Sequence, residues 1–181
     1  MTKGYEVHGL VRADGRETLD RIDPLLDQVT LHEGNLSDQA NLIRIVRATR
    51  PSEIYNLAAQ TFIPASWEMP IETTDATALG VVRVLEAARS ANEPARVFQA
   101  GSSEMFGRVE TSPQNEQTDF RPRNPYATSK VYGYWITSNY RERYDMFACT
   151  GIMFNHESPR RGRDFVTVSY THLTLPTILL V

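Results

Sequence analysis

Short apolar runs alternate with helical patterns along most of the chain, and this alternation restricts the fold more than any other feature. An apolar run bounded by turn residues is typical of a buried strand, whereas apolar residues three and four positions apart are typical of a helix packed on one side. Their alternation indicates β-α-β units and a parallel sheet. We expect strands at residues 5–11, 29–36, 53–59, 96–100 and 146–154, and helices at residues 37–50, 73–91 and 125–144.

Local signals mark the ends and the buried faces of these helices. Ser37 is expected to cap the first helix, since serine is a preferred N-cap residue. Asn124 and Pro125 supply the N-cap and the first helical position of the third. Apolar residues at helical spacing mark the faces of the first two helices: Leu42, Ile43 and Val46 in the first, and Leu79, Val82, Leu85 and Ala88 in the second.

The beginning of the chain departs from the usual order of a nucleotide-binding sheet. A doubly wound sheet of this kind normally starts with a strand, a glycine-rich turn and a helix. Here "MTKGYEVHG" is like the end of that first helix and the opening of the second strand, and no GxGxxG or GxxGxxG occurs in the sequence. We therefore expect either a protein that does not bind a dinucleotide or one whose N-terminal part has been removed.

Charge and cysteine content exclude several classes of protein. The net charge is -3, whereas general nucleic-acid binding needs a basic face, so no nucleic-acid partner is expected. The single cysteine, Cys149, excludes an internal disulfide framework and a cysteine-based metal site; we expect a buried strand residue there, and no metal. No signal peptide is visible and the aliphatic run "ILLV" is too short for a bilayer, which predicts a cytoplasmic protein without a membrane partner.

Tyr126 and Lys130 are the first candidates for chemistry. Lys130 is one of two lysines in a chain with 17 arginines, and it lies four residues after the tyrosine within the expected third helix. This spacing places both side chains on one helix face. A nearby ammonium favours the phenolate form of a tyrosine, whose ordinary pKa is about 10. Such a tyrosine can exchange a proton with a substrate hydroxyl while hydride moves to a nicotinamide.

Two further segments follow expected strands, at the edge where open parallel sheets bind ligands. "AGSSEMFG", residues 100–107, places Ser102, Ser103 and Glu104 just after one strand. "NLAAQT", residues 56–61, places small residues after another, where a backbone can approach a flat cofactor. Each segment alone also matches an ordinary polar loop. In combination with Tyr126 and Lys130 they favour a catalytic site.

These motifs resemble the extended short-chain dehydrogenase/reductase superfamily and, within it, the GDP-mannose 4,6-dehydratase family. The resemblance is carried by "GYEVHGLVR", "LIRIVRATRPSEIYNLAAQ", "SSEMFG", "NPYATSKVYGYWITSNYRERY" and, most specifically, "FNHESPRRG". It implies a Rossmann-like doubly wound α/β fold that lacks the first strand-turn-helix and the C-terminal substrate domain. Residues 1–167 would form a partial NADP-binding domain with the catalytic residues. Residues 168–181, "VSYTHLTLPTILLV", are expected to be a non-native tail.

The resemblance also implies a reaction, the dehydration of GDP-mannose to GDP-4-dehydro-6-deoxy-mannose. Tyr126 would take the proton of the sugar 4-hydroxyl as hydride passes to NADP, while Lys130 would hold the nicotinamide ribose and keep the tyrosine acidic. Ser102 would hydrogen-bond the 4-oxygen. Glu104 would remove the proton at carbon 5 and protonate the departing 6-hydroxyl. Hydride would then return at carbon 6, so that the cofactor ends unchanged.

The cofactor positions of the family fall on a second set of residues. Arg12 follows the strand expected at residues 5–11, where an arginine suits the 2′-phosphate of NADP. Asn35 stands where the family usually has an aspartate beside the adenine, and its carbonyl can still accept a hydrogen bond. The full set implied for cofactor binding is Arg12, Asn35, Leu36, Leu57, Ala58, Ala59, Gln60, Thr61, Lys130, His156 and Arg161.

Two alternative functions stay open beside this one. The first is another nucleotide-sugar 4,6-dehydratase or epimerase of the same superfamily. The pair Ser103-Glu104 favours the mannose branch, because relatives that act on glucose tend to have Asp-Glu there. The second is a non-catalytic nucleotide-binding module. Since family members assemble as dimers or tetramers, a full-length protein is expected to be a homodimer or homotetramer, and this chain alone is expected to be inactive.

Overall fold

The computed structural model describes residues 3–12, 19, 22–91 and 95–158. All strand pairs among these residues are parallel, which confirms the α/β class predicted from the alternating pattern. Short turns of 3-10 helix lie at Asp23–Gln28 and Ser103–Met105, and a π-helical turn lies at Asp75–Leu79. The other elements are β1 (Val7–Val11), β2 (Val29–Glu33), α1 (Gln39–Thr49), β3 (Glu53–Asn56), α2 (Ile63–Glu68), α3 (Pro70–Thr74), α4 (Gly80–Arg89), β4 (Arg96–Ala100), α5 (Pro125–Tyr144) and β5 (Ala148–Gly151).

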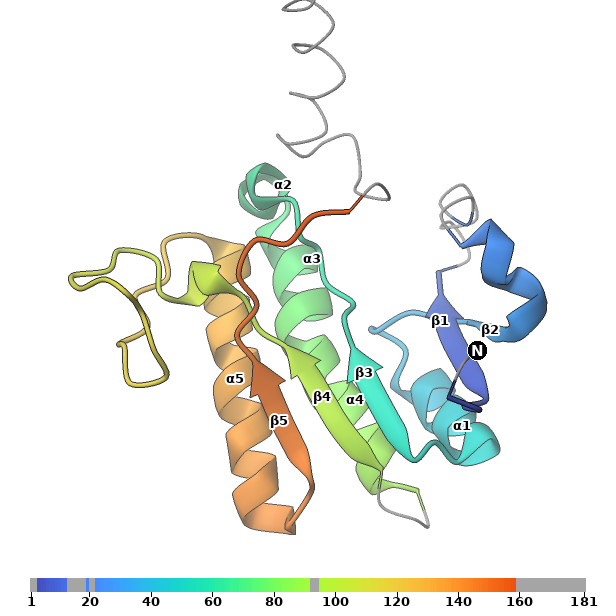
Figure 1. Ribbon diagram of the computed structural model, residues 1–181. Helices are drawn as coiled ribbons and strands as arrows, with labels where there is room; N and C mark the ends of the chain where they lie inside the picture. The colour runs from blue at the N-terminus through green and yellow to red at the C-terminus, as the bar shows by residue number, and fades with distance from the viewer. Residues whose placement is uncertain (1–2, 13–18, 20–21, 92–94, 159–181) are drawn as a thin grey trace, which may run out of the picture.

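The strands form two separate parallel sheets, one of β1 and β2 and one with the order β3-β4-β5 (Figure 1). A doubly wound sheet of six strands has the spatial order 3-2-1-4-5-6. The pair β1-β2 corresponds to positions 2 and 3 of that order, and the triplet corresponds to positions 4, 5 and 6. Position 1 of that order lies between the positions of β1 and β3, and no strand of the described residues occupies it.

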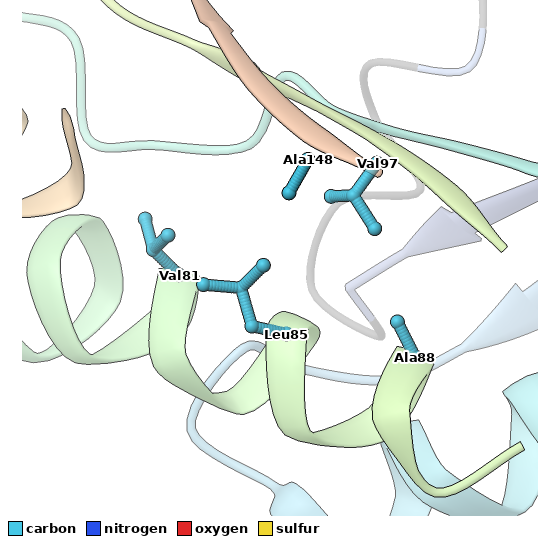
Figure 2. Packing of buried hydrophobic residues seen from close by; sticks show 5 residues of the cluster. All are labelled: Val81, Leu85, Ala88, Val97 and Ala148. Carbon is cyan, nitrogen blue, oxygen red and sulfur yellow. The ribbon is translucent and has the colours of Figure 1, made fainter. Parts of the chain in front are cut away.

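Helices α4 and α5 cover one face of the three-stranded sheet (Figure 1). The core between them is formed by Val81, Leu85 and Ala88 of α4 against Val97 of β4 and Ala148 of β5 (Figure 2). Leu85 is fully buried. Burial of such a side chain stabilises a fold by about 1.5–3 kcal/mol. This core fixes the position of β4, at whose end the candidate site begins.

A second core cluster joins the two parts of the molecule. Leu36 follows β2, Leu42 lies on α1, and both pack against Val84 and Ala87 of α4. Since α4 also contributes to the core of the three-stranded sheet, one helix is buried on two sides. The short sheet β1-β2 is thereby attached to the rest of the fold through α1 and α4.

The other face of the three-stranded sheet is open in the part of the chain that the structure describes. Tyr55, Phe98 and Cys149 are aligned across β3, β4 and β5 on this face. Tyr55 is 63% exposed, and Cys149 is exposed as well. The prediction of a buried Cys149 is therefore wrong, because strand residues alternate between faces and its side chain lies opposite to the helices. The prediction that the residue lies in a strand is confirmed.

Two details of the helices differ from the sequence prediction. The N-cap of α1 is Asp38, whose carboxylate accepts a hydrogen bond from the amide of Asn41, so the cap lies one residue after Ser37. The helix expected at residues 73–91 begins at Pro70 and ends at Arg89. It contains the π-helical turn, which winds the chain more widely and changes the helical phase. Leu79 is 42% exposed for that reason, although the regular spacing placed it on the buried face.

None of the helices in the described ranges combines the length and the apolar character that crossing a membrane requires.

Candidate active site

The loop after β4 carries two of the predicted catalytic residues and is held in place by the strand beside it. The amide of Gly101 donates to the carbonyl of Gly151 at 2.8 Å, and the amide of Ser103 donates to the carbonyl of Met153 at 2.8 Å. Ser102 and Glu104 therefore leave the sheet at its carboxyl edge, where open α/β sheets bind ligands.

Two glycines allow this loop to turn tightly. A Cβ at Gly101 would come within 2.9 Å of the Gly151 carbonyl, so a larger residue would push the two strands apart. Gly107 has a φ of +53°, and a Cβ there would overlap the carbonyl of Arg121. Only glycine adopts this conformation at little cost. The spacing of glycines in "AGSSEMFG" thus has a structural reason.

Glu104 is bonded to the first turn of α5. Its backbone amide donates to Ser102 Oγ at 3.2 Å, and its Oε2 accepts a hydrogen bond from Asn124 Nδ2, also at 3.2 Å. Asn124 is the predicted N-cap of α5, and its Oδ1 accepts from the amide of Ala127 at 2.7 Å. One asparagine therefore caps the helix and holds the carboxylate. The second of these contacts is not visible in the sequence.

Lys130 is buried at the junction of α5 and β4. It is 4% exposed, and its Nζ donates to the carbonyl of Ala100 at 2.8 Å. Burial disfavours the charged form of an amine, and it lowers the pKa of Lys130 from 10.5 to about 8. Nζ lies 5.7 Å from the ring centroid of Tyr126, which is itself 7% exposed. The predicted helical pairing of the two residues is confirmed.

The four predicted catalytic residues therefore lie in one cluster at the end of β4 and the start of α5. Ser102 contacts Glu104, Glu104 is bonded to Asn124, and Asn124 stands two residues before Tyr126. Tyr126 and Lys130 share a helix face. A phenol, an ammonium, a carboxylate and a hydroxyl are thus placed near the carboxyl end of β4.

Among the described residues predicted to bind a cofactor, all except Lys130 on α5 follow the carboxyl ends of four strands. Arg12 comes after β1 and is exposed, and Asn35 comes after β2 with its Oδ1 accepting from the amide of Ser37 at 3.1 Å. Leu36 is 8% exposed and belongs to the core with Val84, and its carbonyl accepts a hydrogen bond from Arg83 Nη1 at 3.3 Å.

Residues 57–61 follow β3 and end in a small local turn. Leu57 is 62% exposed, and Ala58 is exposed as well. The Oε1 of Gln60 accepts from the amide of Phe62 at 2.6 Å, and the amide of Gln60 donates to Thr77 at 3.3 Å. The Gln60 side chain is therefore used to shape the loop.

His156 follows β5 and is exposed, with Nδ1 2.8 Å from the carbonyl of Phe154. Arg161 and residues 168–181 lie outside the described residues. The predicted boundary between residues 167 and 168 lies outside them as well.

Sequence reasoning missed two buried polar residues beside Lys130. Asn56 and Gln99 are 5% and 2% exposed, and they lie opposite each other on β3 and β4. Asn56 Nδ2 donates to Gln99 Oε1 at 2.7 Å, and Gln99 Nε2 donates to the carbonyl of Ala100 at 3.0 Å. A polar residue near the end of each apolar run, in "EIYN" and "RVFQA", is the signal that reveals them.

A hollow of about 640 Å³ lies between the helical segment 67–79 and the start of α5, lined by Trp67, Thr74, Leu79, Asn124, Thr128 and Tyr132 among others. It shares Asn124 with the catalytic cluster, and Ser102, Glu104, Tyr126 and Lys130 are not among its lining residues. We therefore locate the candidate site at the carboxyl edge of the sheet. Within the described ranges, no group of three or more His, Cys, Asp or Glu residues is arranged to hold a metal ion.

Comparison with solved structures shows the fold. The structure resembles dTDP-glucose 4,6-dehydratase from Bacillus anthracis in complex with NAD, with a TM-score of 0.84, 18% sequence identity, and coverage of 97% of this chain and 54% of that one. It also resembles the structure of RMD from Pseudomonas aeruginosa complexed with NADPH, with a TM-score of 0.74, 21% identity, and coverage of 91% of this chain and 59% of that one. The Rossmann-like fold predicted from the resemblance is confirmed.

Comparison with known sequences shows the family. Residues 1–177 match the family model described as GDP-mannose 4,6 dehydratase. The chain is 48% identical to the GDP-mannose 4,6-dehydratase of Yersinia enterocolitica and 44% identical to that of Drosophila melanogaster. Each alignment covers 94% of this chain, and covers 48% and 46% of the respective relative. The chain thus spans about half the length of the curated relatives it matches, and it belongs to the GDP-mannose 4,6-dehydratase family.

Proposed function

We propose that the whole protein converts GDP-mannose to GDP-4-dehydro-6-deoxy-mannose and water, with NADP as the bound hydride carrier. The observation that carries the proposal is the joint placement of Ser102, Glu104, Tyr126 and Lys130 at the end of β4 and the start of α5. The family of the chain supports the choice of GDP-mannose among nucleotide sugars.

The described residues fit the nicotinamide end of a dinucleotide. Lys130 brings a buried ammonium to the carboxyl edge of the sheet, and Ala58 and Ala59 offer small side chains at the neighbouring strand end. These groups suit a ribose hydroxyl and a flat ring, respectively. Bound NADP would accept hydride from carbon 4 of the sugar and return it to carbon 6, which leaves the cofactor unchanged overall.

Tyr126 and Ser102 act at the 4-oxygen of the sugar in this proposal. Tyr126 accepts the proton of the 4-hydroxyl, and the charge of Lys130 on the same helix face favours the phenolate that does so. The Ser102 hydroxyl donates a hydrogen bond to the same oxygen as it becomes a ketone. Its Oγ already accepts from the Glu104 amide, which leaves its proton for the sugar.

Glu104 acts at carbons 5 and 6. Once carbon 4 is a ketone, the hydrogen on carbon 5 is acidic enough for a carboxylate to remove. Glu104 takes this proton and delivers it to the 6-hydroxyl, which departs as water and leaves a double bond between carbons 5 and 6. When hydride returns to carbon 6, carbon 5 takes up one proton, which balances the proton that Tyr126 accepted from the 4-hydroxyl. The hydrogen bond from Asn124 Nδ2 to Glu104 Oε2 leaves the other carboxylate oxygen available for this transfer.

NADP is proposed over NAD because of Arg12 at the end of β1. An acidic residue at this position of a doubly wound fold binds the 2′-hydroxyl of NAD, whereas an arginine accommodates the 2′-phosphate of NADP. Arg12→Glu is therefore expected to weaken NADP binding more than NAD binding. Calorimetric titration of both cofactors into an active form of the protein measures this difference.

A chimera provides the most direct test of the proposed reaction. Residues 4–158 of this chain would replace the corresponding segment of the Yersinia enterocolitica relative, and the chimera would be incubated with NADP and GDP-mannose. We expect a product that has lost one water, detected by mass spectrometry, and a Tyr126→Phe chimera slower by about 10²–10⁴-fold. A folded chimera that binds both ligands without turnover would contradict the proposal and favour a non-catalytic module.

The same assay is applied to the chain alone. We propose that the 181-residue chain alone gives no product, since it spans about half the length of its curated relatives. Product from the isolated chain would overturn that statement.

We also propose that the whole protein assembles as a homodimer or homotetramer. Trp67 on α2 and Trp135 on α5 are 63% and 56% exposed, and exposed aromatic residues of this size favour contact with another protein surface. Light scattering coupled to gel filtration measures the mass of the active chimera. A monomer at micromolar concentration would contradict the proposal.

A further inference from the structure

A chain of hydrogen bonds runs through the buried face of the sheet and ends on Lys130. It starts at Asn56 on β3, passes through Gln99 on β4, and reaches the carbonyl of Ala100. That carbonyl also accepts the Nζ hydrogen bond of Lys130. The three side chains are 5%, 2% and 4% exposed, so the whole chain of bonds is shielded from solvent.

The chemistry of the groups fixes the direction of these bonds. The Ala100 carbonyl can only accept, so the Gln99 amide must turn its Nε2 toward it. Gln99 Oε1 then points to β3, where the partner must be a donor, and Asn56 supplies its Nδ2. A leucine or a carboxylate at Asn56 would leave Gln99 Oε1 without its donor. Burying an unpaired polar atom of this kind costs about 1–3 kcal/mol.

The shared carbonyl links Gln99 to the ammonium. Gln99 Nε2 and Lys130 Nζ are both within hydrogen-bond distance of one oxygen, at 3.0 Å and 2.8 Å. A carbonyl oxygen has two lone pairs, and two donors therefore saturate it. Because Gln99 occupies one lone pair of this oxygen, the ammonium of Lys130 can bond only to the other lone pair. Without Gln99, a water molecule or a second lysine proton competes for the free lone pair.

We propose that Gln99, held by Asn56, is the positioning residue that fixes where the Lys130 ammonium sits relative to Tyr126. Its catalytic meaning rests on the proposed function, whereas the coupling between Gln99 and Lys130 does not. Gln99 acts through the Ala100 carbonyl and does not touch a substrate. In an active chimera, Gln99→Met lowers kcat at least severalfold and leaves KM for the sugar nucleotide unchanged.

The two lysines of the chain make the coupling directly measurable. With lysine labelled by ¹³C at Cε and ¹⁵N at Nζ, the NMR spectrum of the protein contains one signal from Lys3 and one from Lys130. Lys130→Arg assigns the signals, and Lys3 serves as an internal reference in each sample. Titration of the Lys130 signal in the unmodified chain gives the reference pKa against which the variants are compared.

Gln99→Glu keeps the shape of the side chain and places a carboxylate beside the ammonium. An opposite charge bonded to the same region as the amine favours its protonated form, so the pKa of Lys130 is expected to rise by about one unit or more. Gln117→Glu is the chemically matched control, because Gln117 is exposed in a loop. Thr150→Val is the control within the sheet: Thr150 is half-buried beside Gln99 on β5, and its hydroxyl has no hydrogen-bond partner in the described part of the chain. Neither control is expected to move the Lys130 signal.

Gln99→Met gives a second measurement if the glutamate variant does not fold. This near-isosteric change removes both hydrogen bonds, and we expect the Lys130 ammonium protons to exchange with water at least tenfold faster. A folded Gln99→Glu protein whose Lys130 pKa equals that of Gln117→Glu would overturn the proposal, as would unchanged ammonium exchange in Gln99→Met. If the pKa of Lys130 shifts in Gln99→Glu but the chimera with Gln99 unchanged is inactive, the proposed function is refuted and the coupling between Gln99 and Lys130 still holds.

Discussion

At the scale of single residues, Lys130 and Asn124 each do more than the sequence motif indicates. Lys130 is placed in the interior by its bond to the Ala100 carbonyl, and its burial opposes its charge. Asn124 caps the helix with its side-chain oxygen and donates a hydrogen bond to Glu104 from its side-chain nitrogen. Both residues combine a structural contact with a proposed catalytic one, so variants must separate the two effects.

The low pKa of Lys130 predicts a pH dependence of stability. Its pKa is about 8 in the folded protein and 10.5 ordinarily, so the unfolded chain binds more protons between these values. The free energy of unfolding therefore rises with pH from about 8 to 10.5, by on the order of 3 kcal/mol from this group. Urea unfolding at several pH values measures it for the protein and for Lys130→Met.

The difference between the two curves isolates Lys130 together with its effect on Tyr126, because Cys149 and the other tyrosines contribute equally to both. We expect the free energy of unfolding of the unmodified protein to rise relative to that of Lys130→Met as pH increases through this window. Two parallel curves would show that the amine is not desolvated in the folded state.

Asn124 offers a clean separation of capping from positioning. Serine caps a helix about as well as asparagine, but it lacks the amide that donates to Glu104. Asn124→Ser is therefore expected to cost less than about 0.5 kcal/mol of stability, and Asn124→Ala about 1 kcal/mol. In the active chimera both variants should lower kcat roughly tenfold without raising KM. Full activity of the serine variant would show that Asn124 is not needed to position Glu104.

At the scale of elements, α4 is the part on which the site most depends. It is buried against β4 and β5 on one side and against α1 on the other. The π-helical turn at Asp75–Leu79 precedes α4 and determines how α4 is rotated about its own axis, and hence which residues face the sheet and which face α1. Because β4 carries the loop with Ser102 and Glu104, loosening α4 is expected to disturb the catalytic cluster as well as the core.

Leu85 and Leu79 give a matched test of this arrangement. Leu85 is fully buried in the core, whereas Leu79 is 42% exposed after the π-helical turn. Leu85→Ala is expected to lower the free energy of unfolding by about 2–5 kcal/mol, and Leu79→Ala by well under 1 kcal/mol. Denaturant unfolding compares them. Equal losses would contradict the rotation of the helix and support the regular face expected from the sequence.

At the scale of the whole molecule, the open face of the three-stranded sheet is expected to control association between copies in solution. Tyr55 and Phe147 are 63% and 67% exposed, and Cys149 on β5 is exposed on the same face. The interval between β1 and β3 also leaves strand edges without a partner strand in the described residues. Apolar faces and free edges of this kind promote association between copies.

Charged substitutions on this face test that expectation. The double variant Tyr55→Lys with Phe147→Glu should reduce concentration-dependent association of the isolated chain severalfold, as measured by sedimentation velocity. Lys3→Glu, far from this face in sequence and also exposed, is the control for a general effect of charge. Identical association of the double variant and the unmodified chain would place the contact on another surface.

The sequence alone determined the order of the strands and of the three long helices between them, and the identity of the candidate catalytic motif. The strand at 96–100 and the helix at 125–144 form with the predicted bounds, because their apolar runs, the Asn124 cap and Pro125 are local signals. The pairing of Tyr126 with Lys130 follows from helical spacing for the same reason. How these residues act remains a proposal.

The tertiary structure decided which faces are buried and which polar groups meet. Leu79 and Cys149 are exposed because a π-helical turn and an uncovered sheet face override their apolar character. Gln99 meets Asn56 across 43 positions of sequence, and Glu104 meets Asn124 across 20. Contacts of this length depend on how strands and helices pack, and no local pattern of residues encodes them.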